Sequence, residues 1–206
     1  SSPIVSGERV FLTCYSGYGL DPRNPGDQAK LKRHAICLDR RSGKILWQHE
    51  VTTSLPDTPF TGTYITTHGY ASSTPATDGE RVYVTFLDGF DAVVAAYDLD
   101  GKEQWLVRPA QFKSVHGFSS SPVVFDDKLL INGDHDGNAW IAALARKDGA
   151  TLWKIDRENR TRSYCTPLVR ELAGRTQMIL SGSKSVASYD PRTGRRHWII
   201  DGRTEQ

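Results

Sequence analysis

The sequence lacks the features that mark several large classes of protein. No apolar run approaches the roughly 18 residues of a membrane-spanning helix, and no stretch keeps a helical period for more than a turn or two. The net charge is only +2, from 26 basic and 24 acidic residues, so no electropositive field for nucleic acid or a membrane surface is expected. These deficits favour a chain of many short, half-buried strands, with no nucleic-acid partner and no membrane span.

Cysteine and targeting signals are also scarce. The three cysteines, Cys14, Cys37 and Cys165, are odd in number and widely spaced, so we expect buried thiols on strands. A Cys14–Cys37 bridge across one hairpin is the alternative, and the spacing does not choose between them. Neither a basic-then-apolar leader nor an initiator methionine opens the chain, so we expect a segment of something longer.

What the sequence does contain is a repeat, because four of its five tryptophans occur in one motif. Gly-x-x-x-Trp recurs roughly every fifty residues. Its glycines and tryptophans are Gly43 and Trp47, Gly101 and Trp105, Gly149 and Trp153, and Gly194 and Trp198. A Ser-Pro or Thr-Pro pair keeps step with it, with its proline at Pro3, Pro75, Pro122 and Pro167. The chain is therefore predicted to hold four copies of one unit.

Each copy is predicted to contain four short strands separated by turns. In the second copy the turn pair Asp78-Gly79 precedes the alternating run 81–86, and the apolar run 92–97 follows. Repeated four-stranded antiparallel units are the blades of a β-propeller. We therefore predict an all-β fold, one propeller segment over 1–206. Its blades are placed at about 1–50, 72–108, 119–156 and 164–201, with long loops at 15–34 and 52–71. The repeated indole is expected to fill the gap between adjacent blades.

The sequence around these tryptophans resembles a known repeat. Cys37-x-Asp39-x-x-Ser42-Gly43-x-x-x-Trp47 is similar to the tryptophan-docking motif of the pyrroloquinoline-quinone (PQQ) type propeller, Ala-x-Asp-x-x-Thr-Gly-x-x-x-Trp. The copy ending at Trp198 matches as well, whereas the second copy is one residue short in the turn. The third has Ala145 in place of the aspartate. The resemblance covers the whole chain.

This resemblance implies a fold and leaves cofactor use open. The repeat builds PQQ-dependent dehydrogenases and also cofactor-free members, such as the propeller lipoprotein of bacterial outer-membrane barrel assembly. Many dehydrogenases carry adjacent cysteines beside the quinone and bind calcium, but no two cysteines are adjacent here and no calcium motif matches. Rings of the family commonly have seven or eight blades. The resemblance thus implies about half a ring, completed by blades of a longer chain or by a second copy, in the periplasm or at a cell surface.

Polar residues in the loops of one propeller face are the candidate binding site. They are His68, Tyr70, Asp91, His116, Asp134, His135, Asp136 and Lys184. Imidazole and carboxylate groups together can coordinate a metal such as Zn²⁺. The alternative is that His68 and His116, in two loops of similar sequence, only bond backbone carbonyls where a strand begins. We assign no metal ligand and no catalytic residue.

Three functions stay open at this point. We favour a binding scaffold that holds a protein or polymer at one face, without a bound cofactor. The second is a fragment of a PQQ-dependent dehydrogenase, which would bind PQQ and Ca²⁺. The third is a metal-assisted hydrolase or lyase that uses His68, His116 and Asp134. Fold alone does not choose among them.

Overall fold

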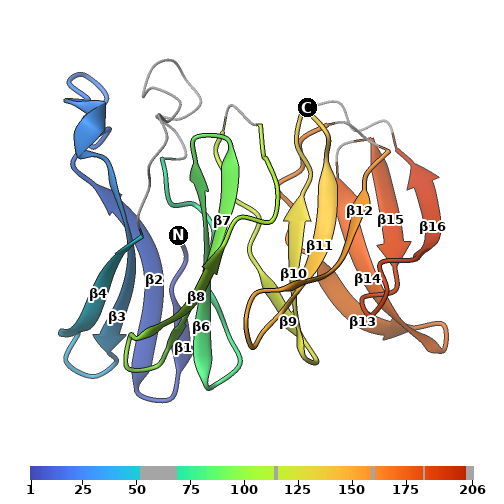
Figure 1. The fold of residues 1–206 in the computed structure, drawn as a ribbon, viewed down its shortest axis with the longest axis horizontal. Helices are drawn as coiled ribbons and strands as arrows, with labels where there is room; N and C mark the ends of the chain where they lie inside the picture. Colours follow the sequence, from blue (N-terminus) through green and yellow to red (C-terminus); the bar gives the residue numbers. More distant parts are fainter. Residues whose placement is uncertain (52–68, 114–115, 159–160, 183, 203–206) are drawn as a thin grey trace. The chain divides into compact units, whose positions relative to one another are not determined.

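The fold consists almost entirely of antiparallel strands. A computed structural model describes residues 1–51, 69–113, 116–158, 161–182 and 184–202. The chain divides into two compact units, residues 1–111 with 115–119, and residues 112–114 with 120–206. Each unit holds two four-stranded sheets, so the predicted four blades of four antiparallel strands are confirmed (Figure 1).

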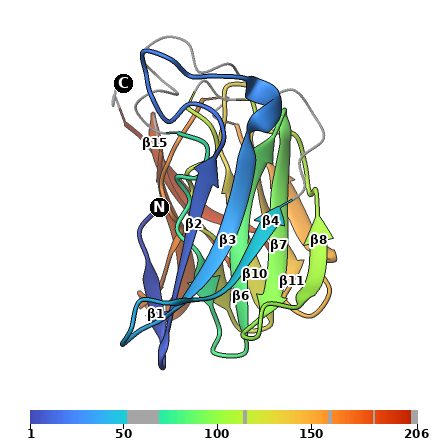
Figure 2. The same cartoon turned by 90° about the vertical axis from the view of Figure 1, so that its left-hand side faces the viewer.

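In the first unit, the two sheets follow the chain in order. The first sheet contains β1 (Ile4–Ser6), β2 (Arg9–Ser16), β3 (Lys32–Asp39) and β4 (Ile45–Val51). The second contains β5 (Ala76–Thr77), β6 (Arg81–Asp88), β7 (Asp91–Asp98) and β8 (Glu103–Val107). Figure 2 looks onto the first sheet, whose strands lie side by side in chain order.

The second unit repeats the same order. Its sheets are β9 (Val123–Phe125), β10 (Lys128–Gly133), β11 (Trp140–Ala145) and β12 (Thr151–Asp156), then β13 (Leu168–Leu172), β14 (Arg175–Gly182), β15 (Ser185–Tyr189) and β16 (Arg196–Asp201). Among the described residues the one helix is the 3-10 turn η1 (Gln28–Lys30), and no described helix could cross a membrane.

The core of each unit lies between its two sheets. In the first unit, Phe11 and Cys37 of the first sheet pack against Val84 and Ala95 of the second, and all four are at most 1% exposed. In the second unit, Ile141 and Ala143 pack with Met178 and Leu180 in the same way. Small and β-branched side chains on these faces let the sheets approach closely.

The same irregularity occurs in all four sheets. The register shifts next to the residue that faces the repeated tryptophan, and that residue is always small. The pairs are Cys37 with Trp47, Ala96 with Trp105, Ala143 with Trp153, and Ser188 with Trp198. A small side chain opposite an indole leaves room for the ring. The bulge changes the direction in which the tryptophan side chain leaves the outermost strand. This explains the small residue at the start of the repeated motif.

One expectation about the first sheet was wrong, and a second is not tested. The loop placed at 15–34 is shorter, because β2 runs to Ser16 and β3 begins at Lys32. The segment Lys32–His34 was expected to be loop because its residues are polar or charged. In the structure it is the start of β3, and Arg33 and His34 are only 1% and 6% exposed. The loop placed at 52–71 lies mostly outside the described residues.

The three cysteines are free thiols. Along the β2–β3 ladder Cys14 faces His34, whereas Cys37 faces Phe11. Since Cys14 and Phe11 are three residues apart on one strand, the two thiols point to opposite faces of the sheet. The Cys14–Cys37 bridge is therefore not formed.

Candidate functional site

The loop after β10 carries three of the predicted binding residues, Asp134, His135 and Asp136. His135 is 3% exposed, and its Nδ1 accepts hydrogen bonds from the backbone N–H groups of Gly137 at 2.9 Å and Lys113 at 3.2 Å. Its ring lies 5.2 Å from that of Phe112, between centroids. Burial lowers the pKa of His135, so the imidazole is neutral and serves to hold the loop.

Asp134 is bound by an arginine that the sequence analysis did not select. The guanidinium of Arg157 donates from Nε to Oδ1 at 2.7 Å and from Nη2 to Oδ2 at 3.1 Å. Both side chains are 2% exposed. Burial raises the pKa of Asp134, while the hydrogen bonds and charge of Arg157 act in the opposite direction. A two-pronged buried pair of this kind fixes both side chains in one geometry.

Further polar groups extend the pair into a network in the second unit. Arg157 also donates from Nη1 to the hydroxyl of Tyr189, and the backbone N–H of Ser163 donates to the carbonyl of Asp134 at 3.4 Å. The hydroxyl of Ser163 donates to Sγ of Cys165 at 3.0 Å. Burial raises the pKa of the Cys165 thiol, which keeps it protonated at neutral pH. The network therefore joins the β10–β11 loop to the strands of the fourth sheet.

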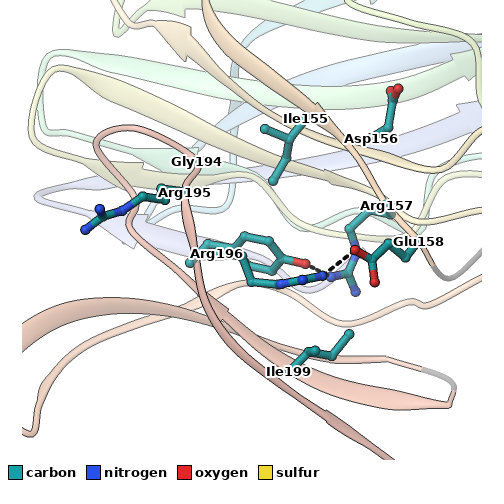
Figure 3. Close-up of a pocket in the computed structure, with 9 residues that line it drawn as sticks. Ile155, Asp156, Arg157, Glu158, Gly194, Arg195, Arg196 and Ile199 are labelled. Carbon is teal, nitrogen blue, oxygen red and sulfur yellow. Dashed lines mark hydrogen bonds and ion pairs between the residues drawn. The ribbon is translucent and has the colours of Figure 1, made fainter.

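Arg157 and Tyr189 form one wall of a cleft between the third and fourth sheets. The cleft has a volume of about 450 Å³ and lies between β12 and β16 (Figure 3). Ile155 and Ile199 supply apolar surface on either side, as the close-up shows. Arg196 of β16 pairs with Glu158 across it at 2.5 Å, between Nη1 and Oε1. The cleft thus combines the apolar side chains of two isoleucines, the ion pair of Arg196 with Glu158, and the buried guanidinium of Arg157.

The other predicted residues are distributed over both units. Tyr70 is buried in a small aromatic cluster with Tyr15 and Tyr18, its ring centroid 5.4 Å from that of Tyr15. Asp91 begins β7 and His116 is half-buried in a turn, both in the first unit. His68 lies outside the described residues. His116 belongs to the first unit and Asp134 to the second, so the grouping of His68, His116 and Asp134 stays a prediction.

In the second unit the two remaining candidates lie apart from the buried network. Asp136 pairs with Arg162 at 3.1 Å on the surface. Lys184 is exposed at positive φ in the β14–β15 turn, where its carbonyl accepts from Gly202. The residues that the sequence analysis missed are Arg157, Ser163, Cys165 and Tyr189. The segment 156–162 is rich in charged residues. This composition does not distinguish an arginine that is buried from one that is exposed to solvent.

The described carboxylates in this loop do not fit a calcium ion beside PQQ. Both oxygens of Asp134 already accept from Arg157, and Asp136 pairs with Arg162. Within the described part of the chain, no group of three or more His, Cys, Asp and Glu side chains is arranged to hold a metal ion. We derive no reaction step through PQQ or calcium from these residues.

Comparison with known proteins identifies relatives of about twice this length. The sequence is 22% identical to the uncharacterized protein RP232 of Rickettsia prowazekii (strain Madrid E), over 96% of this chain and 48% of that protein. The structure resembles BamB from Moraxella catarrhalis, with a TM-score of 0.60 at 20% identity, over 96% of this chain and 50% of that one.

A quinohemoprotein alcohol dehydrogenase, ADHIIG from Pseudomonas putida HK5, is similar to the same degree in fold. Its TM-score is 0.61 at 14% identity, over 97% of this chain and 33% of that one. At such identities the likeness shows the fold alone, which is that of a partial β-propeller. The chain spans half or less of the proteins it matches here.

The family assignment rests on the sequence as well as on the fold. A family described as "Outer membrane protein assembly factor BamB" matches residues 32–204, which is most of the chain. The match begins at the start of β3 and covers all four Gly-x-x-x-Trp motifs. The predicted PQQ-type repeat propeller is therefore confirmed, and the chain belongs to the family of outer membrane protein assembly factor BamB.

Proposed function

We propose that this chain is a binding scaffold, a PQQ-type propeller segment that holds a polypeptide partner and carries out no chemistry of its own. The observation that supports this most is the cleft between β12 and β16. Its apolar surface, from Ile155 and Ile199, lies beside the charged groups of Arg196 and Glu158. This mixture suits an apolar side chain flanked by polar backbone and charged neighbours, as a polypeptide presents.

The wall of the cleft that contains Arg157 is preorganised for binding. Arg157 is held on three sides, by both oxygens of Asp134 and by the hydroxyl of Tyr189. Binding therefore does not have to order this wall, and the entropy cost of immobilising a long side chain is avoided. A volume of about 450 Å³ accommodates one or two side chains of a partner.

The family supports the kind of partner and the compartment. The family description names an outer membrane assembly factor, so we propose a protein partner in outer-membrane assembly, met in the periplasm or at the cell surface. The polar loops of the second unit that hold Asp134 and Lys184 remain a second proposed contact surface of the same scaffold.

The test is binding to a purified outer-membrane barrel-assembly complex from which the resident BamB has been removed. We expect saturable binding, weakened about tenfold or more by Arg196→Glu, which reverses the charge at the cleft. Lys154→Glu is the matched control, because Lys154 is exposed on β12 and does not line the cleft. Absence of saturable binding, or equal effects of the two variants, contradicts the proposal.

A PQQ-dependent dehydrogenase is the second candidate, supported by the fold shared with the alcohol dehydrogenase ADHIIG. Titration with PQQ and Ca²⁺ separates the two functions. Quinone absorbance that saturates, together with reduction of a dye by an added alcohol, would establish the dehydrogenase and refute the scaffold.

A further inference from the structure

Two repeated tryptophans make the same contact with the following sheet. Trp47 donates from Nε1 to the carbonyl of Leu99 at 2.9 Å, and Trp153 donates to the carbonyl of Pro191 at 3.2 Å. Each acceptor directly follows the aspartate of the motif in the next sheet. Each ring also lies on that sheet's motif glycine, Gly101 in one case and Gly194 in the other.

The indole lies so close to the glycine that no residue with a side chain fits at that position. A Cβ on Gly101 would lie 2.7 Å from Cγ of Trp47, and one on Gly194 would lie 2.8 Å from Cε3 of Trp153. Both glycines have positive φ, +91° and +73°. The glycine turn is therefore a receptor for an indole, built from backbone alone.

Trp198, in the fourth sheet, makes a different contact. Its Nε1 donates to Oε1 of Gln177 at 2.9 Å, within the same sheet. The face that carries Trp198 is apolar and open to solvent. The cross-strand pairs place Leu168, Ile179 and Val186 on it together with Ile200, and Leu168 and Ile200 are 47% and 63% exposed. This surface, which we term the Trp198 face, is the counterpart of the face through which Trp153 packs on the fourth sheet.

The first sheet carries the complementary feature. Gly43 has the same positive φ, +69°, as the receptor glycines, but a Cβ built on it meets no atom within 4 Å. The carbonyl equivalent to those of Leu99 and Pro191 belongs to Arg40. The neighbouring face of the sheet is apolar and partly exposed, with Val5 at 56% and Ile45 at 60%. Val5 and Ile45 both align with the Val10–Leu38 pair, which places them on one face.

Among the contacts that the structure describes, Trp198 makes none of the Trp47 kind, and the Gly43 turn is of the receptor type but has no indole on it. We propose that the Trp198 face docks on the first sheet of a second copy of this chain, with the indole of Trp198 on the Gly43 turn of that copy. The Nε1 of Trp198 then donates to the carbonyl of the second copy's Arg40. Two reciprocal contacts of this kind cover both apolar faces in both copies.

The test is the mass of the 206-residue chain in solution, by sedimentation or light scattering over a range of concentrations. We expect a self-associated species of at least twice the monomer mass. Ile200→Lys places a charge on the Trp198 face and should weaken association about tenfold or more. Because Ile200 is exposed, this variant keeps the fold of the chain, which circular dichroism checks. Leu152→Lys on β12, also at an exposed leucine, is the control and should have little effect.

A second pair of variants tests the receptor side. Gly43→Ala places a methyl group where the indole docks, so it should weaken association. Gly174→Ala is matched, because Gly174 has φ +74° and equally open surroundings but lies in the β13–β14 turn. A chain that stays monomeric at high concentration overturns the proposal. So does an assembly that withstands both Ile200→Lys and Gly43→Ala.

Discussion

Trp153 and Gly194 are in contact although they belong to different sheets of the second unit, so the glycine has no room for a side chain. A Cβ on Gly194 would lie 2.8 Å from Cε3 of Trp153, far inside van der Waals contact. The packing of two sheets therefore depends on a residue that contributes no side chain.

This contact predicts an unequal effect of two similar substitutions. Gly194→Ala and Gly174→Ala both place alanine at positive φ, +73° and +74°, which costs roughly 1 kcal/mol in each case. Only Gly194→Ala also overlaps an indole, and overpacking adds about 1–3 kcal/mol. Urea unfolding monitored by tryptophan fluorescence should show Gly194→Ala as clearly the less stable variant. Equal losses in the two variants would contradict the contact.

The hydrogen bond donated by the indole N–H of Trp47 can be tested separately from the packing of its ring. Trp47→Phe keeps an aromatic ring between the first two sheets but removes the hydrogen bond to the carbonyl of Leu99. We expect a loss of about 1–3 kcal/mol, because the carbonyl loses its partner and the smaller ring leaves space. Trp47→Ala should cost more. The comparison is made by urea unfolding, and a neutral Trp47→Phe would argue against a contribution from this hydrogen bond.

The buried pair of Asp134 and Arg157 predicts strong coupling. Asp134→Asn leaves a buried guanidinium without its counter-charge, which costs about 3–5 kcal/mol. Arg157→Met should be less costly at low pH than at neutral pH. Burial already raises the pKa of Asp134, and without Arg157 the carboxyl can take up a proton as the pH falls. The double variant Asp134→Leu with Arg157→Met should lose less than the sum of the single changes, as a double-mutant cycle measures.

His135 predicts a loss of stability on the acid side of neutrality. Burial lowers its pKa in the folded chain below the ordinary value of 6.5, and nearby Asp134 and Asp136 only partly oppose this. The unfolded chain therefore binds more protons below about pH 6.5, so the free energy of unfolding falls as the pH drops through that range. The slope from this residue is at most about 1.4 kcal/mol per pH unit.

The measurement is the urea midpoint at several pH values for the native chain and for His135→Gln. The variant should have a shallower slope below about pH 6.5. Burial lowers the pKa of His34 as well, so part of the slope should remain. If the slope were unchanged in His135→Gln, protonation of His135 would not destabilise the folded chain, which would contradict the prediction.

The architecture could be predicted because its signals are local and repeated. Turn pairs such as Asp78-Gly79 and alternating runs such as β6 specify hairpins over a few residues. Where local signals failed, as at Lys32–His34, charged side chains were buried by partners distant in the sequence. His34, for example, is bonded at its two ring nitrogens to Ser16 at 2.7 Å and Gln48 at 3.2 Å.

The candidate site was harder to predict for the same reason. Asp134, His135 and Asp136 are visible as a polar cluster in a loop, but their partners are not. Arg157 lies 23 residues from Asp134 in the chain, and Tyr189 lies 32 residues from Arg157. Nothing in the local pattern separates Arg157 from the solvated arginines near it.

By itself, the sequence determined the repeat, the four antiparallel sheets and the family, because each follows from short motifs that recur in phase. Only the tertiary structure decided what each side chain does. It buried Asp134 against Arg157, opened the cleft beside Ile199, and left Trp198 without the glycine turn that Trp47 and Trp153 occupy. The physical reason is that hydrogen bonding and burial depend on which distant strands meet, and a repeat specifies its units more strongly than the contacts between them.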